Sequence, residues 1–356
     1  TSHRRRQVRA LAATEVATLW ENNADAWARQ ARLGVDVFRD LLNTPPSLAL
    51  LPPLAALRGL DVGCGEGANT RQLAGLGAKM SAVDIAPTFV RYAQASEACD
   101  PLGIDYAIGD AMQLPFDDGA FEFVTAFMSL MDMPDPGRAL REIRRVLRPG
   151  GFVQFSILHP CFVPPRRRVL RNRKGKARAI EIGDYFESTE GRVDCWWFST
   201  LTGKERHEVA PFRTPIFHRT LSQWFDLLAA AGLVVEKLGE PTAGTGPHAN
   251  HPVIEDTRVA PMSLHVRARR AGDWSPRRPF FDVFGTRRNP RAISTPAPLQ
   301  PPFEENAMTL KLRLRATLAA TCMSLAMAAL PARAAGLPLV TRGECTASSG
   351  AVKDAH

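Results

Sequence analysis

The chain has 356 residues and carries 45 lysines and arginines against 36 aspartates and glutamates, which gives a formal net charge of +9. This length provides for a domain of about 250 residues with extensions at both ends. The six cysteines lack the short paired spacing of zinc sites and of disulfide-rich domains. We therefore expect no metal and, as the simplest location, the reducing cytoplasm.

The first predicted elements are an N-terminal helix within residues 1–45 and a strand, turn and helix around residues 60–76. An apolar run ends at Asp61, three alternating glycines follow at Gly63, Gly65 and Gly67, and a helical pattern begins at Asn69. Glycine permits unusual dihedrals and close approach to a ligand, and a helix start offers unpaired N–H donors. The stretch predicts a site for a nucleotide-like cofactor.

A second strand is predicted over residues 77–83 and ends at Asp84, about 20 residues after the glycines, where a carboxylate can accept both hydrogen bonds of a ribose diol. A third strand, residues 104–108, leads into Gly109 to Met112. The pattern up to Asp84 fits a nicotinamide or flavin dinucleotide as well as other nucleoside cofactors.

From residue 121 onward, the sequence again predicts strands that alternate with helices. Strands are predicted over residues 121–127 and 152–158, with a helix between them that begins at Asp135-Pro136 and stops at Pro149. A further helix spans residues 221–231, and two short strands follow, at Val234 with Val235 and at residues 262–266. This order predicts an α/β doubly wound sheet with parallel pairing and helices on both faces.

From Trp20 to about Arg270 the chain resembles the class I S-adenosylmethionine-dependent methyltransferases of the bacterial small-molecule type. The motifs that carry the resemblance occur in family order: residues 61–67 with Asp61 and its glycines, Asp84, residues 109–111, residues 114–116 (Leu-Pro-Phe) and residues 145–151. The resemblance implies a three-layer Rossmann-like fold around a seven-stranded sheet, with an insert after strand five.

The resemblance also implies a set of residues that bind S-adenosylmethionine. Asp61 and the glycine turn are expected to hold the methionine moiety, Asp84 the ribose, and Asp110 the adenine amino group beside an apolar wall. An ordinary turn aspartate is the alternative for Asp110. The complete expected set is Asp61, Gly63, Cys64, Gly65, Gly67, Asp84, Ile85, Asp110, Ala111, Met112, Phe127 and Trp20.

The catalytic residues are sought just beyond the carboxyl ends of the strands, where ligands bind in such sheets. Methyl transfer needs a general base only when the acceptor must lose a proton. His159 is the first candidate, and His218 and Asp132 follow it; a histidine hydrogen-bonded to nearby backbone is the equal alternative. The methionines around Asp132 either line an apolar substrate pocket or simply pack. The segment 127–132 lacks the prolines typical of amino methylation of adenine or cytosine.

The predicted insert, residues 160–218, is expected to act as a lid or substrate region, with its aromatics either closing over the acceptor or forming a small core of their own. Trp20 and Trp27 of the N-terminal helix are expected to cap the cofactor. Within the insert, residues 166–178 hold eight basic residues and no acidic one. We interpret them as a solvated loop, and an RNA methyltransferase gripping phosphates is the nucleic-acid alternative.

The predicted function is methyl transfer to a small molecule, without assignment of the acceptor atom or of the oligomeric state. A nicotinamide-dependent oxidoreductase with the same glycine turn is a further alternative, disfavoured by Asp110-Ala111 and by residues 114–116. A cofactor-binding fold without catalysis is the last one.

The sequence divides into an N-terminal cap (1–45), a methyltransferase domain (46–270), a Pro/Arg-rich linker (271–307), a segment laid out like a secretory signal peptide (308–335) and a disordered tail (336–356). We expect the signal-like segment to be foreign to the domain, as the start of a neighbouring secreted protein joined to this frame. A membrane partner is expected only if residues 316–332 act as an anchor, and that run is short for a span.

Overall fold

The computed structural model describes residues 9–198, 200–201, 203–244 and 251–272. The first eight residues of the predicted N-terminal cap and, apart from residues 271–272, the predicted linker, signal-like segment and tail lie outside these residues. Among the described helices, none is long and apolar enough to cross a membrane.

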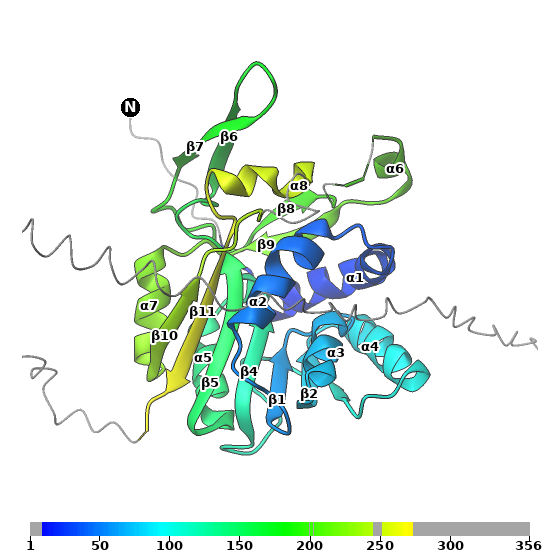
Figure 1. Ribbon diagram of the computed structural model, residues 1–356, viewed down its shortest axis with the longest axis vertical. Coiled ribbons are helices and arrows are strands. Elements are labelled where there is room, and N and C mark those ends of the chain that lie inside the picture. Colours follow the sequence, from blue (N-terminus) through cyan, green and yellow to red (C-terminus); the bar gives the residue numbers. More distant parts are fainter. Residues whose placement is uncertain (1–8, 199, 202, 245–250, 273–356) are drawn as a thin grey trace, which may run out of the picture. The chain divides into compact units, whose positions relative to one another are not determined.

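Within the described residues, seven strands form one sheet in the order β10-β11-β5-β4-β1-β2-β3 (Figure 1). Their bounds are β1 Arg58–Val62, β2 Lys79–Asp84, β3 Asp105–Ile108, β4 Phe121–Phe127, β5 Leu147–Leu158, β10 Leu233–Gly239 and β11 Ser263–Arg270. The alternation of apolar runs with helical patterns predicted this sheet, and the seven-stranded Rossmann-like fold is confirmed.

The direction of the last strand differs from the prediction of parallel pairing. Strand β11 runs antiparallel to both of its neighbours, β5 and β10. Parallel neighbours are usually joined by a crossover helix. In the described part of the β10–β11 connection, the helical elements are only the four-residue helix α8 (Pro252–Glu255) and the short 3₁₀ turn η3 (Asp256–Arg258), and β11 runs back beside β10.

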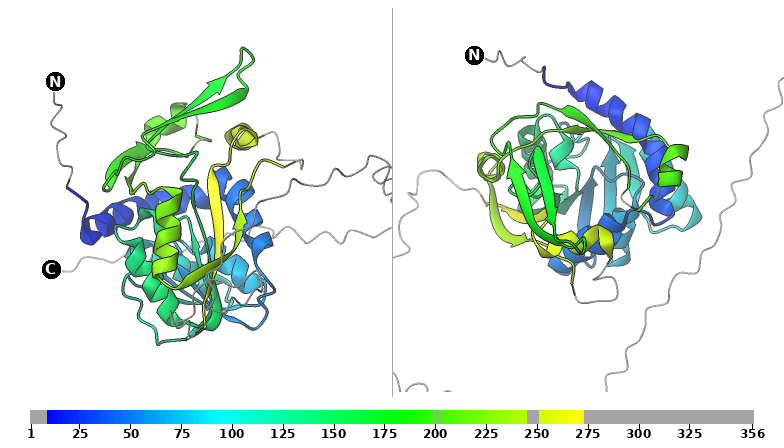
Figure 2. Two further views of the ribbon diagram at one scale, coloured as in Figure 1. Left: turned by 90° about the vertical axis from the view of Figure 1, so that its left-hand side faces the viewer. Right: turned by 90° about the horizontal axis from the view of Figure 1, so that it is seen from above.

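Helices cover both faces of the sheet and give three layers (Figure 2). One buried cluster joins the sheet to side chains of α5 and α7, such as Leu140 and Leu228, and a second joins it to α3 and α4 through Leu73 and Val90. The helices are α1 Ala13–Arg32, the π-helix η1 Phe38–Asn43, α2 Thr44–Leu50, α3 Ala68–Gly75, α4 Pro87–Cys99, the 3₁₀ turn η2 Leu130–Asp132, α5 Pro136–Val146, α6 Gly203–Glu208 and α7 Leu221–Ala230.

Local sequence explains the ends of the helices. The carboxylate of Asp135 accepts a hydrogen bond from the backbone N–H of Arg138 at 2.9 Å, and Pro136 occupies the first position of α5. Thr220 and Gln223 form a reciprocal capping box at the start of α7. Helix α2 runs across the predicted boundary between residues 45 and 46.

The insert after β5 forms two hairpins. Strands β6 (Arg166–Arg171) and β7 (Ala177–Gly183) pair with each other, as do β8 (Arg192–Trp196) and β9 (Phe212–Ile216). Residues 166–178 are exposed or half-buried, as expected, but the expectation of a loop was wrong, because most of the segment belongs to the β6–β7 hairpin. Figure 1 shows that hairpin standing away from the central sheet.

Candidate active site

A cavity of about 820 Å³ lies beyond the carboxyl ends of β1, β2 and β4. Its walls come from separate parts of the chain: the turn after β1, helix α1, the π-helix η1, the segment after β4, and strands β8 and β9 of the insert. Ligands of open α/β sheets bind at this edge. The cavity therefore occupies the position at which the sequence predicted the chemistry.

The glycine turn has the conformation that its sequence indicates. Gly63 has a φ of +71°, and a Cβ placed on it would lie 2.5 Å from the Cβ of Ser129. The backbone N–H of Gly63 donates to the carbonyl of Val83 at 2.8 Å. Gly65 also has a positive φ, but a Cβ there would meet no atom within 4 Å. The turn is fixed on its inner side, and its backbone at Gly65 faces open space.

Gly67 and Asp61, both expected at the cofactor, do not line the cavity. A Cβ on Gly67 would lie 2.6 Å from the hydroxyl of Tyr106, so close packing explains this glycine. The two oxygens of the buried Asp61 carboxylate accept hydrogen bonds from Thr70 Oγ1 at 2.6 Å and Thr125 Oγ1 at 2.8 Å. The carboxylate is thereby tied to α3 and β4 beneath the turn.

Asp84 lines the cavity at the end of β2 and connects the glycine turn to the start of α4. Its Oδ2 accepts from the N–H of Gly65 at 2.9 Å, and its Oδ1 accepts from the N–H of Ala86 at 2.9 Å. Burial raises the pKa of Asp84 to about 6 despite these bonds, and burial raises that of Asp61 to about 6 as well. The same loss of water raises the pKa of the Cys64 thiol on the cavity wall.

The predicted adenine-binding residues lie together on the wall. Asp110 Oδ1 accepts from the backbone N–H of Met112 at 2.8 Å, which is a local turn contact. The carboxylate still borders the cavity. The remaining residues of this group, all on the cavity wall, are Ile85, Ala111, Met112, Phe127 and Trp20.

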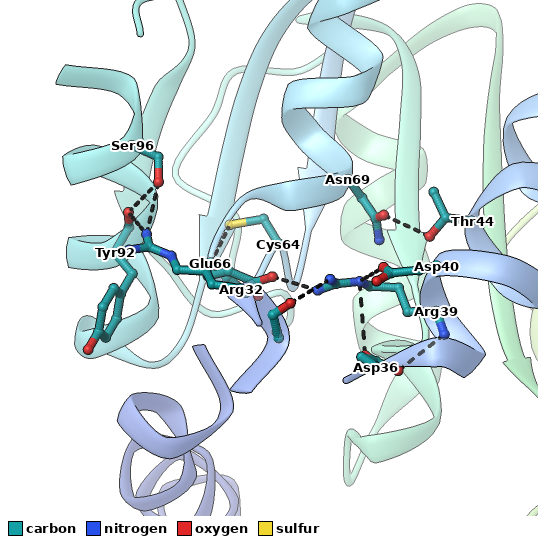
Figure 3. Close-up of polar contacts among 12 residues, drawn as sticks. Arg32, Asp36, Arg39, Asp40, Thr44, Cys64, Glu66, Asn69, Tyr92 and Ser96 are labelled. Atoms are coloured by element: carbon teal, nitrogen blue, oxygen red, sulfur yellow. Dashed lines mark hydrogen bonds and ion pairs between the residues drawn. The ribbon is translucent and has the colours of Figure 1, made fainter. Parts of the chain in front are cut away.

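A partly buried ionic cluster, which the sequence did not reveal, lies beside the glycine turn (Figure 3). The guanidinium of Arg39 contacts Glu66 Oε1 at 2.6 Å and Asp40 Oδ1 at 2.7 Å. Asp36 lies beside it, and burial raises the pKa of Asp36 to about 6. Asp36, Arg39 and Glu66 all line the cavity. Arg39 and Glu66 lie 27 positions apart in the sequence, and no helix or strand periodicity pairs residues at that spacing. The one available signal was the acidic Glu66 within the glycine motif, which calls for a cationic partner when it is buried.

Comparison with known proteins identifies the family to which this site belongs. Residues 60–155 match the model of a methyltransferase domain. A solved S-adenosylmethionine-dependent methyltransferase from Mesorhizobium loti is 25% identical, with a TM-score of 0.51, covering 64% of this chain and 96% of its own. The chain contains a class I S-adenosylmethionine-dependent methyltransferase domain.

Two relatives resemble part of this methyltransferase domain. A ubiquinone biosynthesis O-methyltransferase of Xanthomonas oryzae is 36% identical over 107 residues, which are 30% of this chain and 45% of that protein. The O-methyltransferase cnsE of Penicillium expansum is 38% identical over 172 residues, 42% of this chain and 62% of that protein. The chain thus spans less than two thirds of the length of each.

Neither candidate histidine reaches the main cavity of the methyltransferase domain. His159 is buried, its Nε2 lies 2.9 Å from Glu240 Oε1, and its Nδ1 accepts from the N–H of Cys161 at 3.2 Å. His218 Nε2 lies 2.8 Å from the carbonyl of Tyr185, beside a separate cavity of about 510 Å³. Burial lowers the pKa of His218. Both rings have the hydrogen-bonded environment that was the alternative to catalysis.

Asp132, the third candidate, does line the cavity. Among the described residues, its carboxylate has no hydrogen-bond or ion-pair partner. Burial raises the pKa of Asp132 well above its usual value, and no compensating interaction lowers it. Its position on the cavity wall and its lack of a partner make this carboxylate a candidate proton acceptor.

The insert closes the cavity together with helix α1. Trp27 of α1 packs against Trp196 and Phe212 of the insert at ring-centroid distances of 5.4 and 4.8 Å. The side chain of Asn23 bonds both the carbonyl and the N–H of Arg213. The insert aromatics near α1 therefore form a packed cluster that is also part of the cavity wall.

Proposed function

We propose that the protein transfers a methyl group from S-adenosylmethionine to a small-molecule acceptor. One observation carries the proposal: a single cavity extends from the glycine turn to the insert, and apolar side chains line its insert end. A cavity of this volume is within the range of small-molecule sites. Its position beneath α1 and the insert suits an acceptor that is enclosed during the reaction, because methyl transfer depends on alignment and on exclusion of water.

The hydrogen-bond acceptors and apolar side chains on the cavity wall fit S-adenosylmethionine. The ribose hydroxyls would donate to Asp84, the adenine amino group to Asp110, and Ile85 and Met112 would flank the ring. The methionine moiety would lie along the open face of Gly65, whose own N–H already donates to Asp84. Asp61 would act indirectly, by holding the turn through α3 and β4.

Arg39 adds a cation at the same end of the cavity, next to Glu66 of the turn. Its guanidinium carries donors suited to a carboxylate, and Glu66 and Asp36 would accept from an ammonium. When bound, S-adenosylmethionine supplies a methyl group made electrophilic by its sulfonium. The protein residues orient the two reactants and keep water away.

The name of the Xanthomonas relative, a ubiquinone biosynthesis O-methyltransferase, agrees with a small acceptor. The basic segment of the insert gives less support to RNA, because several of its cations already have acidic partners. Arg168 lies 2.7 Å from Glu181, and Arg171 lies 2.9 Å from Asp256. Surface charge that is paired in this way has less to offer phosphates.

Calorimetric titration of the full chain tests the proposed cofactor. We expect micromolar binding of S-adenosylmethionine and S-adenosylhomocysteine and none of a nicotinamide dinucleotide. An Asp84→Asn variant should bind the sulfur ligands more weakly, whereas Asp105→Asn, at the exposed start of β3, is the matched control. Binding of the dinucleotide alone would overturn the proposal.

A further inference from the structure

We propose that the acceptor is a small, neutral, largely apolar molecule with one hydroxyl group, and that the Asp132 carboxylate receives the hydroxyl proton. This inference rests on the proposed methyl transfer. It goes further, because it assigns the acceptor atom and the residue that removes its proton.

The cavity wall outside the cofactor end is mostly apolar, although Ser129, Asp194 and Thr214 also line it. Asp132 ends the short turn η2 that follows β4, and its neighbours along the chain are methionines. Other apolar residues on the cavity wall come from β5, the insert and the residue before β11. These apolar residues are Met128, Met131, Met133, Pro134, Leu158, Val163, Val193, Ile216 and Met262. Such a surface selects a ligand with little charge.

The charges elsewhere on the described cavity wall already have partners or belong to the cofactor end. Arg39 pairs with Glu66, and Asp194 pairs with Arg192 at 3.1 Å. Asp132 differs, since its carboxylate has no partner among the described residues. Asp132 is half-buried, and a polar group withdrawn from water without a partner is costly. A ligand that donates one hydrogen bond to Asp132 would remove that cost.

The chemistry of methyl transfer decides which donor this is. A neutral amine attacks with its free lone pair and needs no base before the bond forms. A protonated amine would bring a second positive charge beside the sulfonium in an apolar surrounding. A hydroxyl is neutral and becomes a strong nucleophile as it loses its proton. A single half-buried carboxylate on a largely apolar wall therefore fits a hydroxyl acceptor.

The proposed step is balanced. The O–H bond of the acceptor breaks, and its proton passes to a carboxylate oxygen of Asp132. The electron pair on oxygen forms the bond to the methyl carbon while the pair of the carbon–sulfur bond returns to sulfur. The products are a methyl ether, S-adenosylhomocysteine and a protonated Asp132, and the two sides of the equation carry the same net charge.

The segment that carries Asp132 is held by contacts that do not involve its carboxylate. Arg219 donates to the carbonyls of Met133 at 3.2 Å and Pro134 at 2.9 Å. Ser129 Oγ donates to the carbonyl of Val62 at 2.8 Å. Replacement of Asp132 by its isostere should therefore leave the wall in place.

The test compares two probes with the same ring system, 2-naphthol and its methyl ether 2-methoxynaphthalene, of which only the first can donate a hydrogen bond. Both are titrated into the full chain saturated with S-adenosylhomocysteine, at about pH 8, where a phenol with a pKa near 10 remains neutral. Binding is read from probe fluorescence and confirmed by equilibrium dialysis. We expect the wild type to prefer 2-naphthol by about tenfold or more, as for a hydrogen bond to a charged group.

Asp132→Asn should reduce this preference severalfold, and Asp132→Glu should restore part of it. Asp226→Asn, an exposed carboxylate of α7 outside the main cavity, should retain the full preference. Equal affinity of the wild type for the two probes, or an unchanged preference in Asp132→Asn, would overturn the inference.

The design separates two kinds of failure. Loss of S-adenosylhomocysteine binding by the wild type would count against the proposed function itself. Normal binding of S-adenosylhomocysteine, together with no binding of either probe, would instead overturn the proposed acceptor class. Unchanged S-adenosylhomocysteine affinity in Asp132→Asn shows that the variant is folded.

Discussion

The two ends of the main cavity are built in different ways. At the glycine end, backbone geometry and the fixed carboxylates of Asp61 and Asp84 hold a turn between two adjacent strands. At the insert end, side chains from α1, the segment after β4 and the β8–β9 hairpin meet. The glycine end is formed by residues close together in the sequence, whereas the insert end is formed by contacts between segments far apart in the sequence. Cofactor recognition is thus readable from a motif, whereas acceptor recognition is not.

The largest expected effect comes from steric change at the glycine end. Gly63→Val would place a side chain at a left-handed φ against Ser129, which displaces the turn. We expect S-adenosylmethionine binding to become undetectable by calorimetry. Gly103→Ala is the matched control: its φ is +73° and no neighbour lies within 4 Å, so it should cost only about 1 kcal/mol of stability and leave binding intact. Retained S-adenosylmethionine binding in Gly63→Val would show that cofactor binding does not require the observed conformation of the glycine turn.

Asp61→Ala tests the support beneath the same turn. The variant would leave the buried hydroxyls of Thr70 and Thr125 without their acceptor, at a cost of about 1–3 kcal/mol for each unsatisfied group. The free energy of unfolding in urea should fall by that order, and cofactor affinity should fall with it. Asp61→Asn retains one acceptor oxygen, so its loss should be smaller. Equal stability of Asp61→Ala and the wild type would show that Asp61 does not stabilise the turn through Thr70 and Thr125.

The pH dependence separates cofactor binding from stability at this end. Ribose recognition needs an ionised Asp84, so S-adenosylmethionine affinity should fall as the pH drops through about 6. The effect on stability has the opposite sign. A carboxyl with a raised folded-state pKa contributes stability that is present below its unfolded pKa of about 4 and is lost as the pH rises through about 6. Calorimetry and urea unfolding across this window should show both trends, and both should be weaker in Asp84→Asn.

The same contrast between nearby and distant residues explains which features of the fold and the site could be predicted from the sequence. Strand β4, the Asp135 cap of α5 and the residues around Asp110 were predicted because each depends on neighbours along the chain. The direction of β11 was missed because it is set by pairing with β5 and β10, which are far from or separated from β11 along the chain. The Arg39–Glu66 pair, and the contact of His159 with Glu240, join residues far apart in sequence. Periodicity carries no information about such pairs.

The smallest effect is expected on the surface of the insert. Arg168→Ala in β6 removes an exposed ion pair with Glu181, which is worth under about 1 kcal/mol. Small-molecule methylation and S-adenosylmethionine affinity should therefore remain unchanged in Arg168→Ala and in the matched variant Arg173→Ala at the tip of the hairpin. Filter retention of a structured RNA tests the alternative that the basic hairpin binds nucleic acid. If either variant lost RNA retention and methyl transfer together, the basic hairpin would be a nucleic-acid surface, and the insert would recognise phosphates in addition to closing the cavity.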